Sequence, residues 1–418
     1  MHRDDDGAVL RQVFEAGLAH AMPAGRFDGR LPEPPRGRTI VIGAGKAAAS
    51  MAAAFEAAWE APCEGLVVTR YHHAVPTRRI AVVEASHPVP DAAGEDAARR
   101  ILSLAQGAGV DDLVVVLMSG GASSLLALPA PGVTLADKQA INRALLRSGA
   151  PIGEMNTVRK ALSAIKGGRL AAAAAPARLV TYAISDVPGD DPGTIGSGPT
   201  VPESRGGAER ALAILKRYGI AIEPRIAEAI QANAADGSGI DPGAFHMLAT
   251  PMMALEAAAE TARHLGLEAV IWGDAIEGEA SAVGAEHAAR VLGLRPDRPT
   301  LFLSGGETTV TVGAGEKGGR GGRNSEYLLA LAVALGGHPG IAGLACDTDG
   351  IDGSETNAGA WFGPSLLADA KAAGIDLAAH LAAHDAYTPF ERLGRLVDTG
   401  PTFTNVNDFR AILVRGAA

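Results

Sequence analysis

Short apolar runs rich in β-branched residues alternate along the chain with stretches rich in alanine and leucine whose apolar positions recur at helical spacing. This alternation is typical of βαβ units packed around a parallel sheet. In the first half, the runs that predict strands are residues 39–42, 65–68, 80–83, 113–117 and 179–184. The stretches that predict helices are residues 46–60, 92–107, 134–149, 152–166 and 206–218.

The polar, glycine-bearing segment 233–239 is the best candidate for a linker. After it the alternation starts again, with strands predicted at 246–248, 269–271, 300–303 and 341–346 and helices at 251–265, 280–292 and 324–335. We therefore predict two α/β domains, residues 1–236 and 237–418. The first is expected to be a Rossmann-like, three-layer domain with a mostly parallel sheet. In such sheets ligands bind beyond the carboxyl ends of the strands.

The loop after the first predicted strand, Gly43-Ala44-Gly45-Lys46, opens a helix. Glycines there allow backbone N–H groups to approach an anion at the helix N-terminus. A dinucleotide fingerprint would need an acidic residue about 20 residues further on, but the second strand is followed by Arg70 and no carboxylate. The loop also lacks the spacing of a Walker A motif. We expect Lys46 to meet a ligand, because a lysine is otherwise unfavourable beside the positive end of a helix.

A second glycine-bearing loop follows strand 113–117 and reads Ser119-Gly120-Gly121-Ala122-Ser123-Ser124. Consecutive N–H groups and three hydroxyls at a strand end suit a carboxylate or a phosphate. A nucleophilic serine is not expected, because the Gly-x-Ser-x-Gly elbow is absent. The Ser-Gly-Gly triplet returns after a strand at residues 304–306.

Two polar segments follow in the first half. Asn156, Arg159 and Lys160 share one helix face at three- and four-residue spacing, and they either contact phosphate or form a solvated basic face. Residues 185–200 carry three aspartates, including Asp186 and Asp190, in a loop with four glycines and three prolines. Carboxylates next to a phosphate commonly hold Mg²⁺, whereas Asx-turns and helix caps are the competing explanation.

The second half contains a glycine loop, residues 316–326, that carries Arg320 and Arg323 to the start of a helix. We expect this loop to be mobile, and an arginine so placed can lie over a transferring phosphoryl group. The next strand ends in Asp347 and Asp349, candidates for a base or a metal ligand, because the segment lacks the closing glutamate of an EF-hand.

Composition narrows the class of protein. With 37 Lys and Arg against 47 Asp and Glu, the formal charge is −10, which excludes nucleic-acid binding through bulk charge. Only two cysteines, no basic leader and no apolar run long enough for a membrane span lead us to expect a cytoplasmic protein. The 53 glycines exceed the usual share and gather in the loops described above.

Taken together, seven motifs in order along nearly the whole chain resemble the class II glycerate kinases. They are Gly43-x-Gly45-Lys46, Ser119-Gly120-Gly121-x-Ser123-Ser124, Asn156-x-x-Arg159-Lys160, Ser185-Asp186-Val187-x-Gly189-Asp190, Ser304-Gly305-Gly306-Glu307, Gly321-Gly322-Arg323-Asn324-x-Glu326 and Asp347-Thr348-Asp349-Gly350-x-Asp352-Gly353. That family joins an N-terminal glycerate-kinase domain to a C-terminal MOFRL domain, here about residues 297–415. Its members have often been named hydroxypyruvate reductases.

The resemblance implies ATP-dependent phosphorylation of D-glycerate, usually at the 2-hydroxyl, with Mg²⁺. It implies Lys46, Arg323 and Asp349 as the catalytic set: the two cations stabilise phosphoryl charge and the aspartate accepts the hydroxyl proton. We expect the active site in a cleft between the domains and Mg²⁺ near Asp186 and Asp190. The remaining residues expected to bind substrate or phosphate are Gly43, Gly45, Ser119, Gly120, Gly121, Ser123, Ser124, Asn156, Arg159, Glu307 and Asn324.

Two other functions stay open at this stage. One is an NAD(P)H-dependent hydroxypyruvate reductase, in which Arg70 would suit NADP because no acidic residue holds the ribose. The other is a non-catalytic sensor or carrier of small anions. We expect D-glycerate and ATP as partners, neither nucleic acid nor a membrane, and either a monomer or a homodimer.

Overall fold

The computed structural model describes residues 6–203, 205–234, 239–313 and 318–415. The chain forms two compact units: the N-terminal unit, Pro23–Leu248, and the C-terminal unit, which joins Met1–Met22 to Ala249–Ala418. The division therefore differs from the predicted one after residue 236. The first helix belongs to the C-terminal unit and the strand around residue 248 to the N-terminal sheet. The predicted linker 233–239 lies partly outside the described residues.

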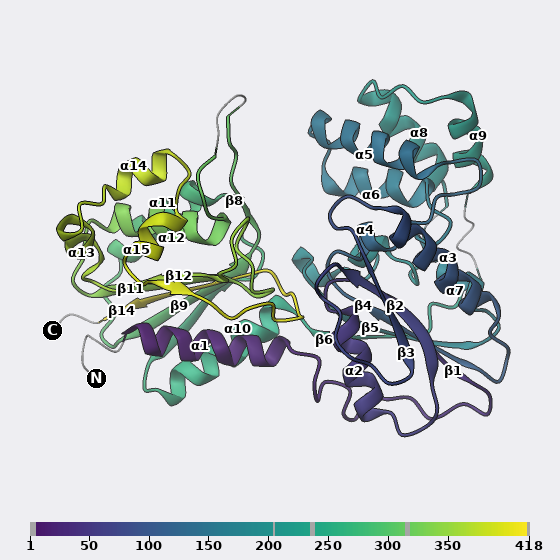
Figure 1. The fold of residues 1–418 in the computed structure, drawn as a ribbon, viewed down its shortest axis with the longest axis horizontal. Helices are drawn as coiled ribbons and strands as arrows, with labels where there is room; N and C mark the ends of the chain where they lie inside the picture. The colour runs from purple at the N-terminus through teal and green to yellow at the C-terminus, as the bar shows by residue number, and fades with distance from the viewer. Residues whose placement is uncertain (1–5, 204, 235–238, 314–317, 416–418) are drawn as a thin grey trace. The chain divides into compact units, whose positions relative to one another are not determined.

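The sheet of the N-terminal unit has six strands in the order β3-β2-β1-β4-β5-β6 (Figure 1). Their bounds are β1 Thr39–Ala44, β2 Glu64–Arg70, β3 Ile80–Ala85, β4 Leu113–Met118, β5 Arg178–Ile184 and β6 Ala244–Ala249. β1 pairs in parallel with β2 and β4, so that Gly43 lies beside Val67 and Leu117. The outer pairs β2–β3 and β4–β5 are parallel as well, which confirms the predicted sheet.

Helices cover both faces of this sheet, which leaves its central strands β1 and β4 buried along their whole length. Helix α3, Ala92–Gln106, packs Ile101 against one face, where Ile40 and Ile42 lie. On the other face Phe55 of α2, Ala48–Ala58, contacts Phe27, which contacts Tyr182 of β5. The short helix α7, Arg169–Ala174, leads into β5.

A group of four helices forms a separate apolar cluster in the N-terminal unit, above the sheet in the view of Figure 1. They are α5 Leu135–Ser148, α6 Ile152–Ala161, α8 Gly207–Arg217 and α9 Pro224–Ala232. Helix α6 ends at Ala161, before the predicted residue 166, because the chain leaves the helix to pair Ser163 with Pro129. It then turns at Gly167 and Gly168, which both have positive φ. The turn lets Lys166 point inward, where it is 1% exposed.

The sheet of the C-terminal unit is mostly antiparallel, in the order β13-β12-β11-β14-β9-β7. Its strands are β7 Glu268–Gly273, β9 Thr300–Gly306, β11 Ile341–Asp347, β12 Gly359–Phe362, β13 Leu396–Val397 and β14 Asp408–Val414. In this sheet, as far as the residues are described, the parallel pair is β7 with β9. The last strand, β14, enters between β9 and β11 and runs antiparallel to both.

Alternation along β9 builds two apolar layers. Leu301 and Leu303 face α1, Asp6–Ala21, and α10, Pro251–His264, whereas Phe302 faces the opposite layer. That layer is formed by α11 Ala280–Leu292 and α12 Arg323–Leu335. The unit is completed by β8 Gly278–Glu279, β10 Thr308–Thr309, α13 Leu366–Ala372, α14 Leu377–Ala382 and α15 Tyr387–Arg392.

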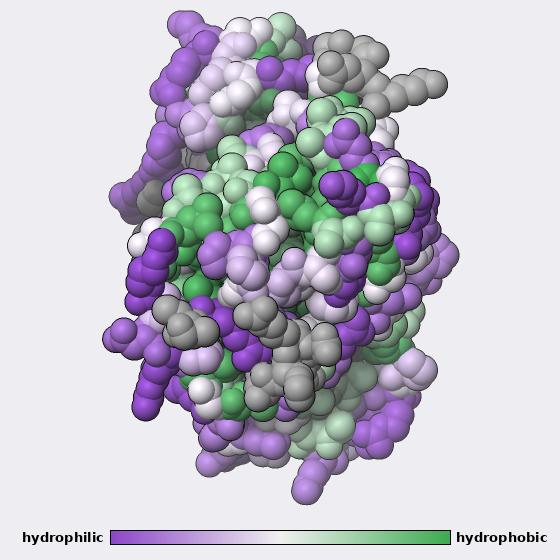
Figure 2. Space-filling view, turned by 90° about the vertical axis from the view of Figure 1, so that its left-hand side faces the viewer, coloured by the Kyte–Doolittle hydropathy of each residue, from purple (hydrophilic) through white to green (hydrophobic). Residues whose placement is uncertain are grey.

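Hydrophilic and hydrophobic residues are interspersed on the face shown in Figure 2. Both cysteines, Cys63 and Cys346, are buried free thiols. Among the described residues no helix combines the length and the apolar character needed to cross a membrane. Most of the buried charged side chains lie in the C-terminal unit, around the start of α12.

Candidate active site

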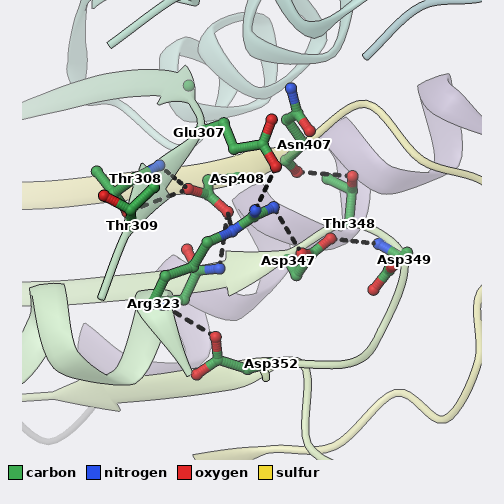
Figure 3. A network of polar contacts seen from close by, with 12 residues as sticks. Glu307, Thr308, Thr309, Arg323, Asp347, Thr348, Asp349, Asp352, Asn407 and Asp408 are labelled. Atoms are coloured by element: carbon green, nitrogen blue, oxygen red, sulfur yellow. Dashed lines mark hydrogen bonds and ion pairs between the residues drawn. The ribbon is translucent and has the colours of Figure 1, made fainter. Parts of the chain in front are cut away.

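A network of charged side chains lies where β9, β11 and β14 meet the first turn of α12 (Figure 3). Arg323, the first residue of α12, lies at its centre. Its Nε donates to Asp408 at 2.8 Å, one terminal nitrogen to Glu307 at 2.6 Å, and the other to Asp347 at 3.0 Å. Burial alone would lower the pKa of Arg323, but the charges of these three carboxylates raise it. The guanidinium is therefore always charged and fixed in one orientation.

Asp408 is the buried centre of the network. Its side chain has no exposed area, and its second oxygen accepts a bond from Arg410, which is also fully buried, at 2.5 Å. The amide of Thr308 donates to the same oxygen at 3.2 Å, and the side-chain amide of Asn324 donates to the first oxygen at 2.9 Å. One carboxylate thus lies between two arginines, and the predicted residues Arg323 and Asn324 are both held by it.

The loop after β11 holds the two candidate aspartates. Asp347 is 5% and Asp349 3% exposed, and the amide of Asp349 donates to a carboxylate oxygen of Asp347 at 3.0 Å. One carboxylate oxygen of Asp349 accepts from the amide of Ile351 at 3.0 Å. The structure therefore brings Arg323, Glu307, Asn324 and the Asp347–Asp349 pair together, as the sequence predicts for these five.

Asp352, from the same motif, fixes the start of α12. Its carboxylate accepts from the amides of Asn324 and Ser325 at 2.9 and 2.8 Å and from the Ser325 hydroxyl. Burial raises the pKa of Asp352. A Cβ on Gly322 would lie 2.4 Å from Asp352, so this part of the glycine loop packs closely, and mobility is not the reason for its glycines. Residues 314–317 lie outside the described residues.

The other arginine of the loop has a different environment. Arg320 bonds to Glu355 at 2.9 and 3.2 Å and lies over the ring of Tyr387, 4.2 Å from its centroid. Its side chain is half exposed. Arg320 therefore forms an ion pair at the surface, and Arg323 is the arginine that bonds to the buried carboxylates.

In the N-terminal unit the loop with Lys46 packs against the loop after β4. The amide of Lys46 donates to the carbonyl of Gly120 at 2.8 Å, and the amide of Ala47 donates to the Ser119 hydroxyl at 3.0 Å. The amide of Gly45 donates to Val68 at 3.1 Å. These three amides are thus used inside the protein, contrary to the expectation that they face an anion.

Close approach of the two loops explains the glycines at their junction. Gly45 has a φ of +137°, and a Cβ there would lie 2.1 Å from the Ser119 hydroxyl. A Cβ on Gly43 would lie 2.2 Å from the carbonyl of Leu117 in the neighbouring strand. Gly121 lies beside the side chains of both His87 and Lys46, at 2.9 and 3.3 Å from its hypothetical Cβ. The glycines therefore bring Lys46 next to the Ser119–Ser124 loop.

A buried lysine joins the Ser119–Ser124 loop to the aspartate loop. Lys166 donates to the carbonyls of Ser123 at 2.8 Å and Gly196 at 3.2 Å, and the hydroxyls of Ser123 and Ser197 bond at 2.8 Å. The Ser124 hydroxyl donates to the carbonyl of Gly121. Sequence reasoning missed Lys166 as a site residue, although a lysine directly before two glycines was a usable signal.

Asn156 and Arg159 lie together on α6, as their spacing predicts. Arg159 donates to the side-chain oxygens of Asn142 at 2.8 Å and Asn156 at 3.2 Å. Asn156 is 7% exposed, and burial lowers the pKa of Arg159. Arg159 is therefore partly buried and held by two side-chain hydrogen bonds, and its contact with phosphate stays a prediction.

The loop 185–200 has mixed roles. Asp191 caps its own turn, accepting from the Thr194 hydroxyl at 2.6 Å and from the amide of Gly193 at 3.3 Å. Asp190 has a positive φ of 53°, in the short helix Pro188–Asp190. Within the described residues no group of three or more His, Cys, Asp or Glu side chains is arranged to hold a metal. The role of Asp186 and Asp190 in metal binding stays a prediction.

The comparison with known proteins covers both units. Residues 9–231 match a family model described as a domain of unknown function (DUF4147), and residues 300–408 match the MOFRL family. The chain is 38% identical over 405 residues to the D-glycerate 2-kinase of Thermotoga maritima, covering 95% of each chain. The crystal structure of Thermotoga maritima glycerate kinase superposes with a TM-score of 0.88 at 34% identity, covering 98% of this chain and 100% of that one.

The chain belongs to the class II glycerate kinase family. The resemblance predicted from the seven motifs is confirmed, and so are the α/β fold and the class of enzyme, a kinase. A protein of Agrobacterium vitis that is 55% identical over 413 residues, covering 97% of this chain and 94% of its own, carries the provisional name hydroxypyruvate reductase.

Membership of the class II glycerate kinases does not by itself assign roles to side chains. Sequence reasoning missed Asp408 and Arg410, the buried pair that holds Arg323. The charged residue Arg410 interrupts the apolar run of β14, so the strand itself was not predicted. An aspartate directly before Phe409, close to the apolar residues 411–414, was a usable signal.

Proposed function

We propose that this class II glycerate kinase transfers the γ-phosphoryl group of ATP to D-glycerate, at the 2-hydroxyl. The proposal is supported by relatives named D-glycerate 2-kinase in Thermotoga maritima and glycerate 2-kinase in Pyrococcus horikoshii. The structural observation that carries it is Arg323, a permanently charged guanidinium held by three carboxylates next to Asp349.

Phosphoryl transfer needs positioned cations more than covalent chemistry. A guanidinium presents several donors in a fixed fork, so it can bind two phosphoryl oxygens at once. The ion pairs hold Arg323 in place before substrate arrives, which lowers the reorganisation needed in the transition state. In the proposed mechanism Lys46 and Arg323 stabilise the charge of the phosphoryl group.

Asp349 is the proposed base. It would accept the proton of the glycerate hydroxyl as that oxygen attacks the γ-phosphorus, while ADP leaves with the bridging oxygen. Its carboxylate is fixed by the amide of Ile351, and its own amide is fixed by Asp347. A general base has to be oriented in this way before its pKa matters.

Mg²⁺ is proposed as the metal of the reaction, held through Asp186 and Asp190. The donor set fits, because Mg²⁺ in phosphoryl-transfer enzymes usually takes one or two carboxylates together with phosphate oxygens and waters. Asp191 is excluded from this set, since both its oxygens are used within the turn. When bound, the metal would neutralise phosphate charge.

The experiment is an assay of purified protein with ATP, Mg²⁺ and D-glycerate. We expect ADP to form in proportion to the glycerate consumed, and NMR of the product to show 2-phosphoglycerate. ADP formation no faster than without glycerate would contradict the proposal. A product phosphorylated at the 3-hydroxyl would contradict the position of transfer alone.

Hydroxypyruvate reduction is the alternative suggested by the name of the Agrobacterium vitis relative. The first glycine loop argues against it, because the amides of Gly45, Lys46 and Ala47 donate within the protein and do not form a pyrophosphate cradle. Oxidation of NADH or NADPH with hydroxypyruvate at a rate above that of glycerate phosphorylation would favour the reductase.

A further inference from the structure

The N-terminal unit contains a cavity of about 380 Å³ whose lining includes four of the residues expected to bind substrate or phosphate, Gly121, Ser123, Ser124 and Arg159. One side is formed by helices α5 and α6. The other is formed by the segment after β3, residues 87–90, and by the Ser119–Ser124 loop. We call it the α5–α6 cavity. A space of this size matches pockets for small molecules.

Most of the wall of the α5–α6 cavity is apolar. Ile141, Leu145, Val158 and Leu162 line it from the helices. Val89 and Leu146, which also line it, are 55% and 56% exposed, which is high for apolar side chains of the described residues. Exposed apolar side chains around a cavity indicate a ligand with an apolar or aromatic part.

Four cations line the same cavity. One is Arg143, which is exposed; the other three are Lys138, Arg159 and Lys166. Their hydrogen bonds go to uncharged oxygens: Lys138 to the carbonyl of Leu128 at 3.4 Å, Arg159 to Asn142 and Asn156, and Lys166 to Ser123 and Gly196. No ion pair of the described residues includes any of the three. Burial lowers the pKa of Lys138 to about 7 and that of Lys166 well below its usual range.

Lys166 is buried, and Lys138 and Arg159 are partly buried. The charge of Glu95 acts on Lys138, but the two side chains form no ion pair. Cations that are withdrawn from water without a carboxylate partner destabilise a fold, so they indicate that an anion arrives with a ligand. Where Gly121 lines it, the cavity lies close to Lys46, the proposed catalytic lysine. Lys166 bonds to Ser123, and Gly121, which lines the cavity, lies within 3.3 Å of the Lys46 side chain by its hypothetical Cβ. An anion bound at the cations therefore has a short path to Lys46.

We propose that the α5–α6 cavity binds the purine nucleotide that donates the phosphoryl group. The base and ribose lie between the apolar walls, and the phosphates extend along Lys138, Arg159 and Lys166 towards Lys46. The inference rests on the proposed kinase function and assigns the donor, which the sequence motifs leave without a site. D-glycerate is a poor match for this cavity, because a three-carbon hydroxy acid has no apolar surface to cover the walls.

The first test measures equilibrium binding of β,γ-imido-ATP with Mg²⁺ to the full chain, with calorimetry as the method. Lys138→Met keeps the length of the side chain and removes its charge, and we expect at least tenfold weaker nucleotide binding. Arg147→Met is the matched control, because Arg147 lies on the same helix and does not line the cavity. The control should bind like the wild type.

A second variant protects the test against a folding defect. Val89→Trp changes a side chain at the cavity that is 55% exposed, so we expect the fold to tolerate it. The larger ring should weaken nucleotide binding tenfold or more. Photolabelling with 8-azido-ATP should modify peptides from residues 87–90 or 135–162. Labelling confined to other peptides, or unchanged nucleotide affinity in both variants, would overturn the inference.

These outcomes separate the inference from the proposed function. Nucleotide binding that both variants weaken, without any phosphorylation of glycerate, would keep the cavity and contradict the kinase. The opposite result is that both variants phosphorylate glycerate with an unchanged KM for ATP and a raised KM for D-glycerate. That result would support the kinase but assign the cavity to D-glycerate, which contradicts the inference.

Discussion

The two units of this class II glycerate kinase differ in the partners of their cationic side chains. In the C-terminal unit Arg323 has three carboxylate partners, whereas in the N-terminal unit Lys138, Arg159 and Lys166 bond only to uncharged oxygens. A paired guanidinium is fixed in direction before substrate arrives. Unpaired cations keep their field for an incoming anion. The difference suggests that one cluster orients the reacting group and the other binds the charged ligand.

The largest expected effect comes from removing the oriented cation. Arg323→Ala should lower kcat at least 100-fold, because donors aimed at the transition state contribute about 10²–10³ in rate. Arg323→Lys should not restore the rate, since a lysine cannot bond to Asp408, Asp347 and Glu307 at once. Steady-state kinetics at saturating ATP measures this. A kcat within threefold of wild type would remove Arg323 from the catalytic set.

The buried ion pair of Asp408 and Arg410 should contribute more to the free energy of unfolding than the half-exposed pair of Arg323 with Glu307. Asp408→Asn leaves Arg410 buried beside a neutral partner, and breaking a buried pair typically costs about 3–5 kcal/mol. Urea unfolding of the variant measures the change in free energy. Glu307→Gln is the matched control, because Glu307 is half exposed and its pair with Arg323 should contribute less than about 1 kcal/mol. Equal losses in the two variants would contradict the contrast.

The unpaired cations should make stability depend on pH. The pKa of Lys138 is lowered to about 7 in the folded protein from its usual 10.5. Between these values the unfolded chain binds more protons, so Lys138 destabilises the fold increasingly as pH falls from about 10 to about 7. Lys138→Met should therefore raise the free energy of unfolding, on the order of 1 kcal/mol at pH 7 and less at pH 10. A gain that is larger at pH 10 would contradict this assignment.

The smallest expected effect concerns the other loop arginine. Arg320→Gln should change kcat less than about twofold, because a half-exposed ion pair contributes little in water. The same assay used for Arg323 measures it. A loss in kcat comparable to that of Arg323→Ala would contradict the assignment of a catalytic role to Arg323 but not to Arg320.

The parallel sheet of the N-terminal unit was predictable because its strands are continuous apolar runs separated by helices of regular period. The antiparallel sheet of the C-terminal unit was not, because pairing direction depends on contacts far apart in sequence. β14 lies between β9 and β11, which precede it by about 100 and 60 residues along the chain. Local periodicity carries no information on such an insertion.

Site residues divided in the same way. The structure brings the motif residues Arg323, Asn324, Asp347 and Asp349 into one cluster, since short segments at strand ends meet at one edge. The partners Asp408 and Arg410 lie in a strand that the pattern did not indicate. The glycines near Lys46 were interpreted as an anion cradle, yet Gly45 is required by the contact with Ser119. A sequence shows which positions lack side chains, but the reason depends on the neighbouring loop.

The most direct measurement follows the labelled phosphoryl group from γ-³²P-ATP to D-glycerate in the wild type and in Arg323→Ala, with nucleotide binding measured on both. We expect labelled 2-phosphoglycerate from the wild type, and from Arg323→Ala normal nucleotide affinity with at least 100-fold slower transfer. No labelled glycerate from the wild type, or transfer by Arg323→Ala at the wild-type rate, would contradict the account.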